Sequence, residues 1–408
     1  MGHFPLRPPL LPMPRNLGWV LNRAFGPVDG VLACPDPSSV VQLASRLSLA
    51  PRIGGRLPPE RLAAEVGEDT AAEFRRRYRL TAAAAVLKQD LCVGLGKRAE
   101  EIQAPLVFLK GAALNLPGSV PIGLRESSDI DVLLPVGKAE EFSQCLSSLG
   151  WTSEDVPLGE QHLTPLLHPG GMGLVEVHWR LTGLRVSGRE PASYGDLEAQ
   201  GLLFPVDTFP GNCYRLSDEA QIAHLVTHAL GQHLWFPGSY PQLRFLADMV
   251  DLGVDEELRS EFRDGGYRWI EEDVREDVFA AAMDLLSLFT RGENAEDVWN
   301  GHSPPSLYLR HILLGVDDPR YLQSIRFRSV SRGLRQPGER GRAVLGLLKT
   351  SLWLTRGQVD QLYGKPRGRL GYLGWRLFRP FDVILRLVRY GFSWISVRLA
   401  RIAGPDRG

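Results

Sequence analysis

Two aspartates interrupt an otherwise apolar segment, Ser128-Asp129-Ile130-Asp131-Val132-Leu133-Leu134. On a β-strand, residues two apart project from the same face, so both carboxylates would lie side by side. Two neighbouring anions repel each other and resist ionisation unless a cation lies between them. The pattern therefore predicts a divalent-metal site for Mg²⁺, with Mn²⁺ as an alternative. Repulsion alone also predicts that Asp129→Asn or Asp131→Asn leaves the metal-free fold intact or stabilised.

A third carboxylate follows in the next apolar segment, Leu174-Val175-Glu176-Val177-His178-Trp179. Glu176 could hold a second metal ion or accept the proton of an attacking hydroxyl, and His178 would share its face. A lone Asp-x-Asp pair is common in solvated turns, and Glu176 alone could be an edge-strand residue that faces water. The apolar flanks of both segments favour the metal interpretation, because buried carboxylates need a partner.

A triphosphate would need positive charge and free backbone N–H groups, and both are predicted near Lys110-Gly111-Ala112. A strand ends here, a glycine permits close backbone approach, and a helix N-terminus favours phosphate. Arg125 could add charge, unless it or Lys110 forms a structural ion pair with Asp129 or Glu126. The candidate nucleotide-binding residues are Lys110, Gly111, Ala112, Arg125 and Ser128.

The elements that must position these residues alternate between strand and helix. Strands are predicted at 104–109, 129–134 and 174–179, with a helix starting near 110 and another over 138–149 that ends before Gly150. Helical patterns precede this unit from about residue 38 and follow it from Ser217, a plausible N-cap. The predicted fold class is α+β: a small mixed sheet flanked by helical regions. Its predicted divisions are 1–103, 104–215, 216–328 and 329–408.

The order of these motifs, from Phe108-Leu109-Lys110-Gly111 through Asp129-Ile130-Asp131 to Val175-Glu176-Val177-His178, resembles an uncharacterised bacterial nucleotidyltransferase family of the polymerase-β superfamily. It is also similar to AbiEii-type nucleotidyltransferases. The resemblance covers about residues 75–255. It implies that Asp129 and Asp131 bind two metal ions, that Glu176 completes the site, and that Gly111 lies where the superfamily contacts the nucleotide phosphates. Ala112 departs from the pattern, because most members carry Ser or Gly there.

Two histidines four residues apart, His224 and His228, lie on a predicted helix beyond this unit. Such spacing can place two imidazoles on one zinc ion, but the glutamate of the His-Glu-x-x-His motif is missing. A role in packing or in lining the cleft is therefore favoured over zinc.

Charge is distributed unevenly along a chain whose formal net charge is zero. Residues 321–408 include 18 Lys and Arg but only 4 Asp and Glu. The pattern of residues 375–402 predicts a basic amphipathic helix. This tail could contact an anionic membrane surface or RNA, or its helix could pack on the protein itself. The absence of a signal-peptide pattern and of CxxC pairs among the four cysteines favours the cytoplasm.

Together these patterns predict an enzyme that transfers a nucleoside monophosphate from a nucleoside triphosphate, such as ATP, to an acceptor hydroxyl and releases pyrophosphate. The acceptor could be a small molecule, a peptide or a protein. Two alternatives remain: a toxin-type enzyme that modifies tRNA, and a catalytically silent nucleotide-binding or membrane-peripheral protein, which the missing hydroxyl at Ala112 would suit.

Overall fold

A computed structural model describes residues 12–153, 162–186, 191–233, 242–254 and 276–317, with isolated positions near both ends of the chain. Of the predicted basic tail, it describes Gly374, Trp375, Phe378, Phe381, Leu385 and Val388. The other residues of that tail lie outside the described residues.

The centre of the molecule is a mixed sheet that, within the described residues, has seven strands in the order β3-β4-β5-β2-β1-β7-β6. Strand β2 pairs antiparallel with β1 and parallel with β5, while β1 pairs parallel with β7. The side chains of β1 are all buried, as expected for a strand with neighbours on both edges and cover on both faces. The strands are β1 (Leu106–Phe108), β2 (Asp129–Leu133), β3 (Thr152–Ser153), β4 (Leu166–Leu167), β5 (Leu174–His178), β6 (Leu203–Pro205) and β7 (Cys213–Leu216).

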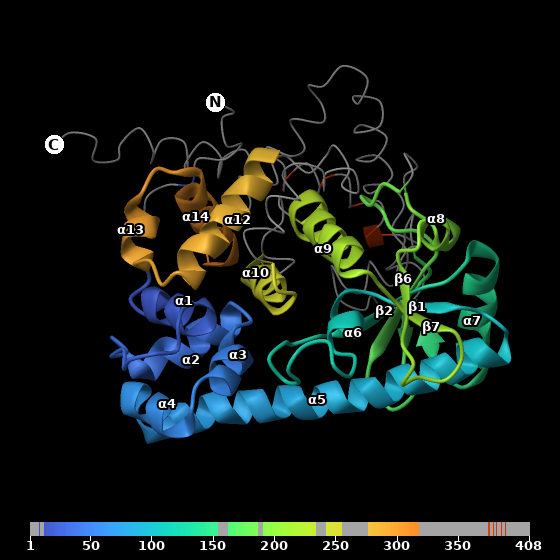
Figure 1. Ribbon diagram of the computed structural model, residues 1–408, viewed down its shortest axis with the longest axis horizontal. Helices are drawn as coiled ribbons and strands as arrows, with labels where there is room; N and C mark the ends of the chain where they lie inside the picture. Colours follow the sequence, from blue (N-terminus) through green and yellow to red (C-terminus); the bar gives the residue numbers. More distant parts are fainter. Residues whose placement is uncertain are drawn as a thin grey trace, which may run out of the picture.

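Helices surround the sheet, and the long α5 (Glu68–Glu101) runs beneath both the sheet and the N-terminal helices (Figure 1). Its start follows Gly67, whose φ of 82° suits glycine, and Glu68 and Asp69 complement the dipole of the first turn. The other helices are α1 (Leu17–Phe25), α2 (Pro37–Arg46), α3 (Ala50–Arg56), α4 (Pro59–Val66), α6 (Lys110–Leu114), α7 (Val136–Ser148), α8 (Tyr194–Ala199), α9 (Asp218–Val226), η1 (Thr227–Gln232), α10 (Gln242–Asp251), α12 (Glu276–Thr290), α13 (Ala295–Asn300) and α14 (Pro304–Asp317).

The N-terminal helices and the helices after residue 276 share one hydrophobic core, although they are far apart in sequence. Phe25 of α1 stacks on Phe289 of α12 with ring centroids 5.6 Å apart. A second core lies between the sheet, α7 and the C-terminal half of α5, and it contains Phe108, Phe142 and Leu95. The sheet therefore lies between two apolar layers, which restricts its polar side chains to the sites described below.

Helix α10 connects the helical part to the sheet through two ion pairs. Arg52 of α3 contacts Asp251 at 2.7 Å, and Arg125, which lies just before β2, contacts Asp248 at 2.8 Å. The second pair is almost completely buried, so the loss of either partner would leave an uncompensated charge in the interior. This contact fixes the segment that leads into the two aspartates.

The predicted α+β class with a small mixed sheet is confirmed, and the three predicted strands appear as β1, β2 and β5. The predicted helix over 138–149 is α7, after which Gly150 adopts a φ of 89°. Ser217 caps α9 by accepting a hydrogen bond from the backbone N–H of Ala220. No helix among the described residues combines the length and the apolar character that crossing a membrane requires. The four divisions of the chain remain a prediction.

Candidate functional site

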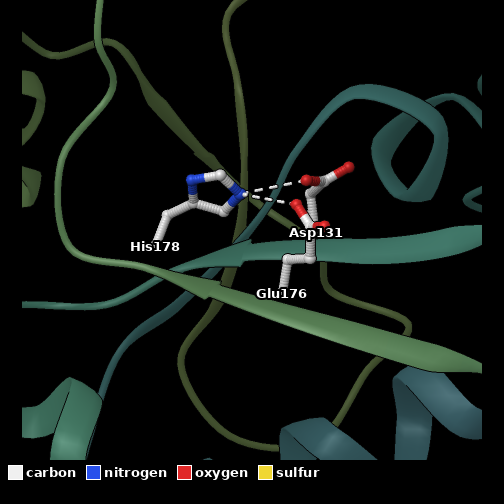
Figure 2. Close-up of side chains that lie close together, drawn as sticks. All are labelled: Asp131, Glu176 and His178. Carbon is white, nitrogen blue, oxygen red and sulfur yellow. Dashed lines mark hydrogen bonds and ion pairs between the residues drawn. The ribbon is translucent and has the colours of Figure 1, made fainter. Parts of the chain in front are cut away.

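The pairing of β2 with β5 places the predicted acidic residues side by side. Asp131 is the register partner of Glu176, and His178 lies on the same face of β5 as Glu176. Figure 2 shows the three side chains of Asp131, Glu176 and His178 directed toward one another from the two strands. His178 Nε2 lies 3.0 Å from Asp131 Oδ1 and 3.7 Å from Glu176 Oε2.

These three residues form a group that could hold a metal ion, because one ligand atom from each lies within 4.8 Å of the others. The predicted metal-binding set was Asp129, Asp131 and Glu176, and its role in metal binding remains a prediction. Among the described residues, the group contains His178 and does not contain Asp129, which lies two positions earlier in β2 and is partly exposed. The two carboxylates supply the oxygen ligands that the predicted Mg²⁺ prefers, whereas an imidazole is more typical of transition-metal sites.

The two carboxylates of this group differ in their affinity for protons. Burial acts to raise the pKa of Asp131, but Lys110 and His178 hold it well below its usual range. Burial and the nearby charge of Asp131 raise the pKa of Glu176 to about 7. Asp131 is therefore ionised, whereas Glu176 is poised to gain or lose a proton near neutral pH.

Lys110 forms an ion pair with Asp131, because the Nζ atom of Lys110 lies 2.9 Å from Asp131 Oδ1. Its backbone has a φ of 45°, a left-handed conformation that disfavours a non-glycine residue by about 1 kcal/mol or more. The side-chain amide of Gln221 in α9 donates a hydrogen bond to the Lys110 carbonyl at 3.3 Å. This strained geometry directs the lysine toward the acidic cluster.

The other predicted nucleotide-binding residues lie next to Lys110 or in the segment that leads into β2. A Cβ atom at Gly111 would collide with the guanidinium of Arg125, so the close approach that this glycine permits is made by a side chain of the protein itself. Arg125 is buried against Asp248, and neither Glu126 nor Asp129 is its partner in that ion pair. Ala112 is buried and Ser128 is exposed. Phosphate contacts by these residues remain a prediction.

The predicted cleft histidines lie in α9 and at the start of the π-helical turn η1, a type of turn frequent at functional sites. His224 is buried, and within the described residues neither ring nitrogen has a hydrogen-bond partner. Burial lowers its pKa to about 3, with Lys110 contributing further. The ring centroids of His224 and His228 are 6.4 Å apart, and among the described residues these two do not belong to a group of three metal ligands.

Sequence reasoning missed Gln221, Lys88 and the contact of Asp248 with Arg125, which lie beside the candidate site. Lys88 left a detectable signal, because it occupies a position of α5 whose spacing matches the buried Ala85, Cys92 and Leu95. A lysine on the buried stripe of a helix needs an explanation. The contacts of Asp248 and Gln221 left no local signal, since their partners lie more than a hundred residues away.

Comparisons with known proteins give one family and one solved structure that the chain resembles. The chain is similar to the antibiotic-resistance factor ANT(2'')-Ia, which is known from a solution structure, with 20% sequence identity. The match covers 43% of this chain and 93% of that chain and has a TM-score of 0.27. The comparison with curated proteins gave no match. The model of a family described as uncharacterised nucleotidyltransferase matches residues 33–261, more than half of the chain. With its acidic residues on adjacent strands inside that match, the chain belongs to this nucleotidyltransferase family.

Proposed function

We propose that the protein transfers a nucleoside monophosphate from a nucleoside triphosphate to an acceptor hydroxyl, releases pyrophosphate and depends on Mg²⁺. The observation that supports this most is the convergence of Asp131, Glu176 and His178 on paired strands within a nucleotidyltransferase. Asp129 extends the same face of β2 toward the start of the strand and completes the proposed set of metal-binding acids. Mn²⁺ would suit the same ligands.

Each residue of the cluster has a distinct role in the proposed reaction. Divalent ions held by Asp129, Asp131 and Glu176 would neutralise charge on the phosphates and orient the reacting groups. In the metal-free protein the pKa of Glu176 is about 7, and in the reaction its ionised carboxylate would accept the proton of the acceptor hydroxyl. His178 contacts Asp131 and keeps that carboxylate oriented. Lys110 can exchange its contact with Asp131 for a contact with a phosphate, because both partners are anions.

The replacement Lys110→Met should weaken the binding of a nucleoside triphosphate and strengthen the binding of Mn²⁺. It removes a point charge that would contact non-reacting phosphates, so nucleoside triphosphate binding should weaken by about tenfold. It also removes the cation that now neutralises Asp131, so Mn²⁺ should bind the nucleotide-free protein more tightly. Titration calorimetry with each ligand measures both effects. Weaker binding of Mn²⁺ would contradict this role and indicate that Lys110 mainly holds the cluster together.

The replacement His224→Leu tests whether the imidazole of His224 contacts a bound substrate. A buried polar group without a hydrogen bond destabilises a fold, so leucine should leave the free energy of unfolding unchanged or raise it by about 1 kcal/mol. If His224 contacts the substrate, transfer should nevertheless fall, because leucine lacks the ring nitrogens that would make this contact. Urea unfolding and a transfer assay on the same preparation provide the comparison. A less stable variant with unchanged transfer would assign His224 to packing alone.

The proposed activity itself is tested by incubating the protein with Mg²⁺ and each labelled nucleoside triphosphate against fractionated cell extract. Label should appear in one class of acceptor, and the Asp131→Asn protein should leave every fraction unlabelled. Label in tRNA would favour the toxin-type alternative, whereas label in a small molecule, a peptide or a protein would favour the main proposal. Nucleotide binding without label in any fraction would favour the catalytically silent alternative. Contact of the tail with an anionic membrane or RNA, and a cytoplasmic location, remain predictions.

A further inference from the structure

A pocket of about 230 Å³ lies between the middle of α5 and the segment 115–127 that leads into β2. Its walls include the basic residues Arg77, Lys88 and Arg125 and one acidic residue, Glu126. In Figure 1, α5 passes under α6 and the loop that follows it. The residues that line the pocket include 125–127, which directly precede Ser128 and Asp129 in the chain.

Lys88 is the unusual member of this wall, because it is only 9% exposed. Its ammonium group donates a hydrogen bond to the carbonyl of Ser127, and among the described residues it forms no ion pair with a carboxylate. Burial lowers its pKa, while the charge of Asp129 acts in the opposite direction. A buried ammonium without a close counter-charge is unfavourable, and an anion in the adjoining pocket would relieve that cost.

The two arginines of the wall each contact a carboxylate, so they differ from Lys88. Arg125 contacts Asp248 at 2.8 Å, and Arg77 contacts Glu73 at 2.8 Å. Guanidinium groups have five N–H donors, so an arginine in an ion pair can still donate to a second oxygen. The pocket therefore combines one uncompensated cation with two further donor groups, which is suitable for the oxygens of a phosphate.

The pocket is connected to the candidate site through Ser127. The hydroxyl of Ser127 donates a hydrogen bond to the Asp129 carbonyl at 2.9 Å, and the Ser127 carbonyl accepts the bond from Lys88. Asp129 begins the strand that carries the proposed metal-binding acids. We propose that this pocket binds a phosphate group of a substrate beside those acids, with Lys88 as its main charge. The phosphate belongs to the donor triphosphate or to a phosphorylated acceptor, and in this respect the inference rests on the proposed function.

Lys88 also has a structural contact that the test must separate from binding. Lys88 and its neighbour Gln89 hold the two ends of the segment 115–127, since Gln89 donates to the Asn115 carbonyl at 2.6 Å. A change at Lys88 could therefore loosen this segment as well as remove a charge. A second position is needed at which charge can be altered without the loss of a native contact.

Ala84 and Ala83 provide this matched pair, because both are exposed on α5 but only Ala84 lines the pocket. Ala84→Glu places a negative charge at the pocket, and Ala83→Glu adds the same charge outside it. Titration calorimetry with inorganic orthophosphate, inorganic tripolyphosphate and each nucleoside triphosphate, all with Mg²⁺, measures the result. Ala84→Glu should weaken binding of at least one of these probes by about tenfold or more, and Ala83→Glu should not.

The three probes distinguish the two sources of the phosphate. A joint loss of tripolyphosphate and nucleoside triphosphate binding assigns the pocket to the donor. A loss of orthophosphate binding with unchanged nucleotide affinity assigns it to a phosphorylated acceptor. Equal affinities of Ala84→Glu, Ala83→Glu and the unaltered protein for every probe overturn the inference. If the unaltered protein transfers no nucleotide but Ala84→Glu still weakens phosphate binding, the proposed function is wrong and the inference of a phosphate-binding pocket holds.

Lys88→Met extends the test, with Lys97→Met as its control on an exposed position of the same helix. Lys88→Met should lose the same probe as Ala84→Glu, and Lys97→Met should retain it. If Lys88→Met does not fold, the alanine pair alone decides. If it folds and binds every probe with unchanged affinity, Lys88 is not the charge that holds the phosphate and the inference is wrong.

Discussion

The Asp131→Asn protein is expected to lose nucleotide transfer by about a thousandfold or more. Asp131 is the carboxylate at the centre of the cluster, and it contacts both Lys110 and His178. Asparagine keeps the shape but removes the charge that would hold a divalent ion, and the loss of about 4 kcal/mol of transition-state stabilisation corresponds to that factor. Single-turnover transfer with labelled nucleoside triphosphate measures the effect. Turnover within a few fold of the unaltered protein would remove Asp131 from the reaction.

The same replacement should also destabilise the metal-free protein, which differs from the expectation based on repulsion. The pKa of Asp131 lies well below its usual range because Lys110 and His178 favour its charge. Asparagine would leave the largely buried ammonium of Lys110 without its partner, and breaking a buried pair of this kind costs about 3 kcal/mol or more. Transfer must therefore be assayed below the melting temperature of the variant. Asp129→Asn, at a partly exposed position, should also lose transfer but with a smaller change in stability.

Local patterns in the sequence were sufficient for the strands that carry the acids. The segments at β2 and β5 are short, apolar and β-branched, and their acidic residues alternate with buried ones, so the face that carries Asp131 and Glu176 followed from the period of a strand. The parallel pairing that makes these two residues register partners could only be assumed. Strand β7 was not predicted, because Cys213–Leu216 includes Tyr214 and Arg215 in a short run without a clear apolar period.

The contacts of Lys110 and Arg125 could not be predicted, because each depends on a partner or a conformation that sequence does not reveal. Lys110 reaches Asp131 through a left-handed backbone conformation that a non-glycine residue rarely adopts. Arg125 forms an ion pair with Asp248, which lies 123 residues later in the chain. Lys110 and Arg125 were predicted to contact nucleotide phosphates, and in the structure each contacts a carboxylate. Electrostatic neutrality thus requires these partners within the protein before any ligand arrives.

Glu176→Gln should change the pH dependence of stability in the metal-free protein. The pKa of Glu176 rises from 4.5 to about 7 on folding, so its contribution to stability is fully present below pH 4.5 and is lost as the pH rises through 7. Glutamine does not titrate, so relative to the unaltered protein the variant should gain stability between these values. At pH 8 the gain should be on the order of 2 kcal/mol, which is less than the full shift implies because the side chain is partly exposed.

Urea unfolding of both proteins at several pH values between 4 and 8 measures this difference. The buried histidines of the site, whose pKa values are lowered, make stability rise with pH below about 6.5, but they are present in both proteins and largely cancel in the comparison. Mg²⁺ favours the ionised form of Glu176, so it should stabilise the unaltered protein more at pH 8 than at pH 5. In the variant, where Asp129 and Asp131 remain, its effect should be smaller and should depend less on pH. A stability difference that does not change with pH would mean that Glu176 ionises normally, and it would then be a poor base for the acceptor hydroxyl.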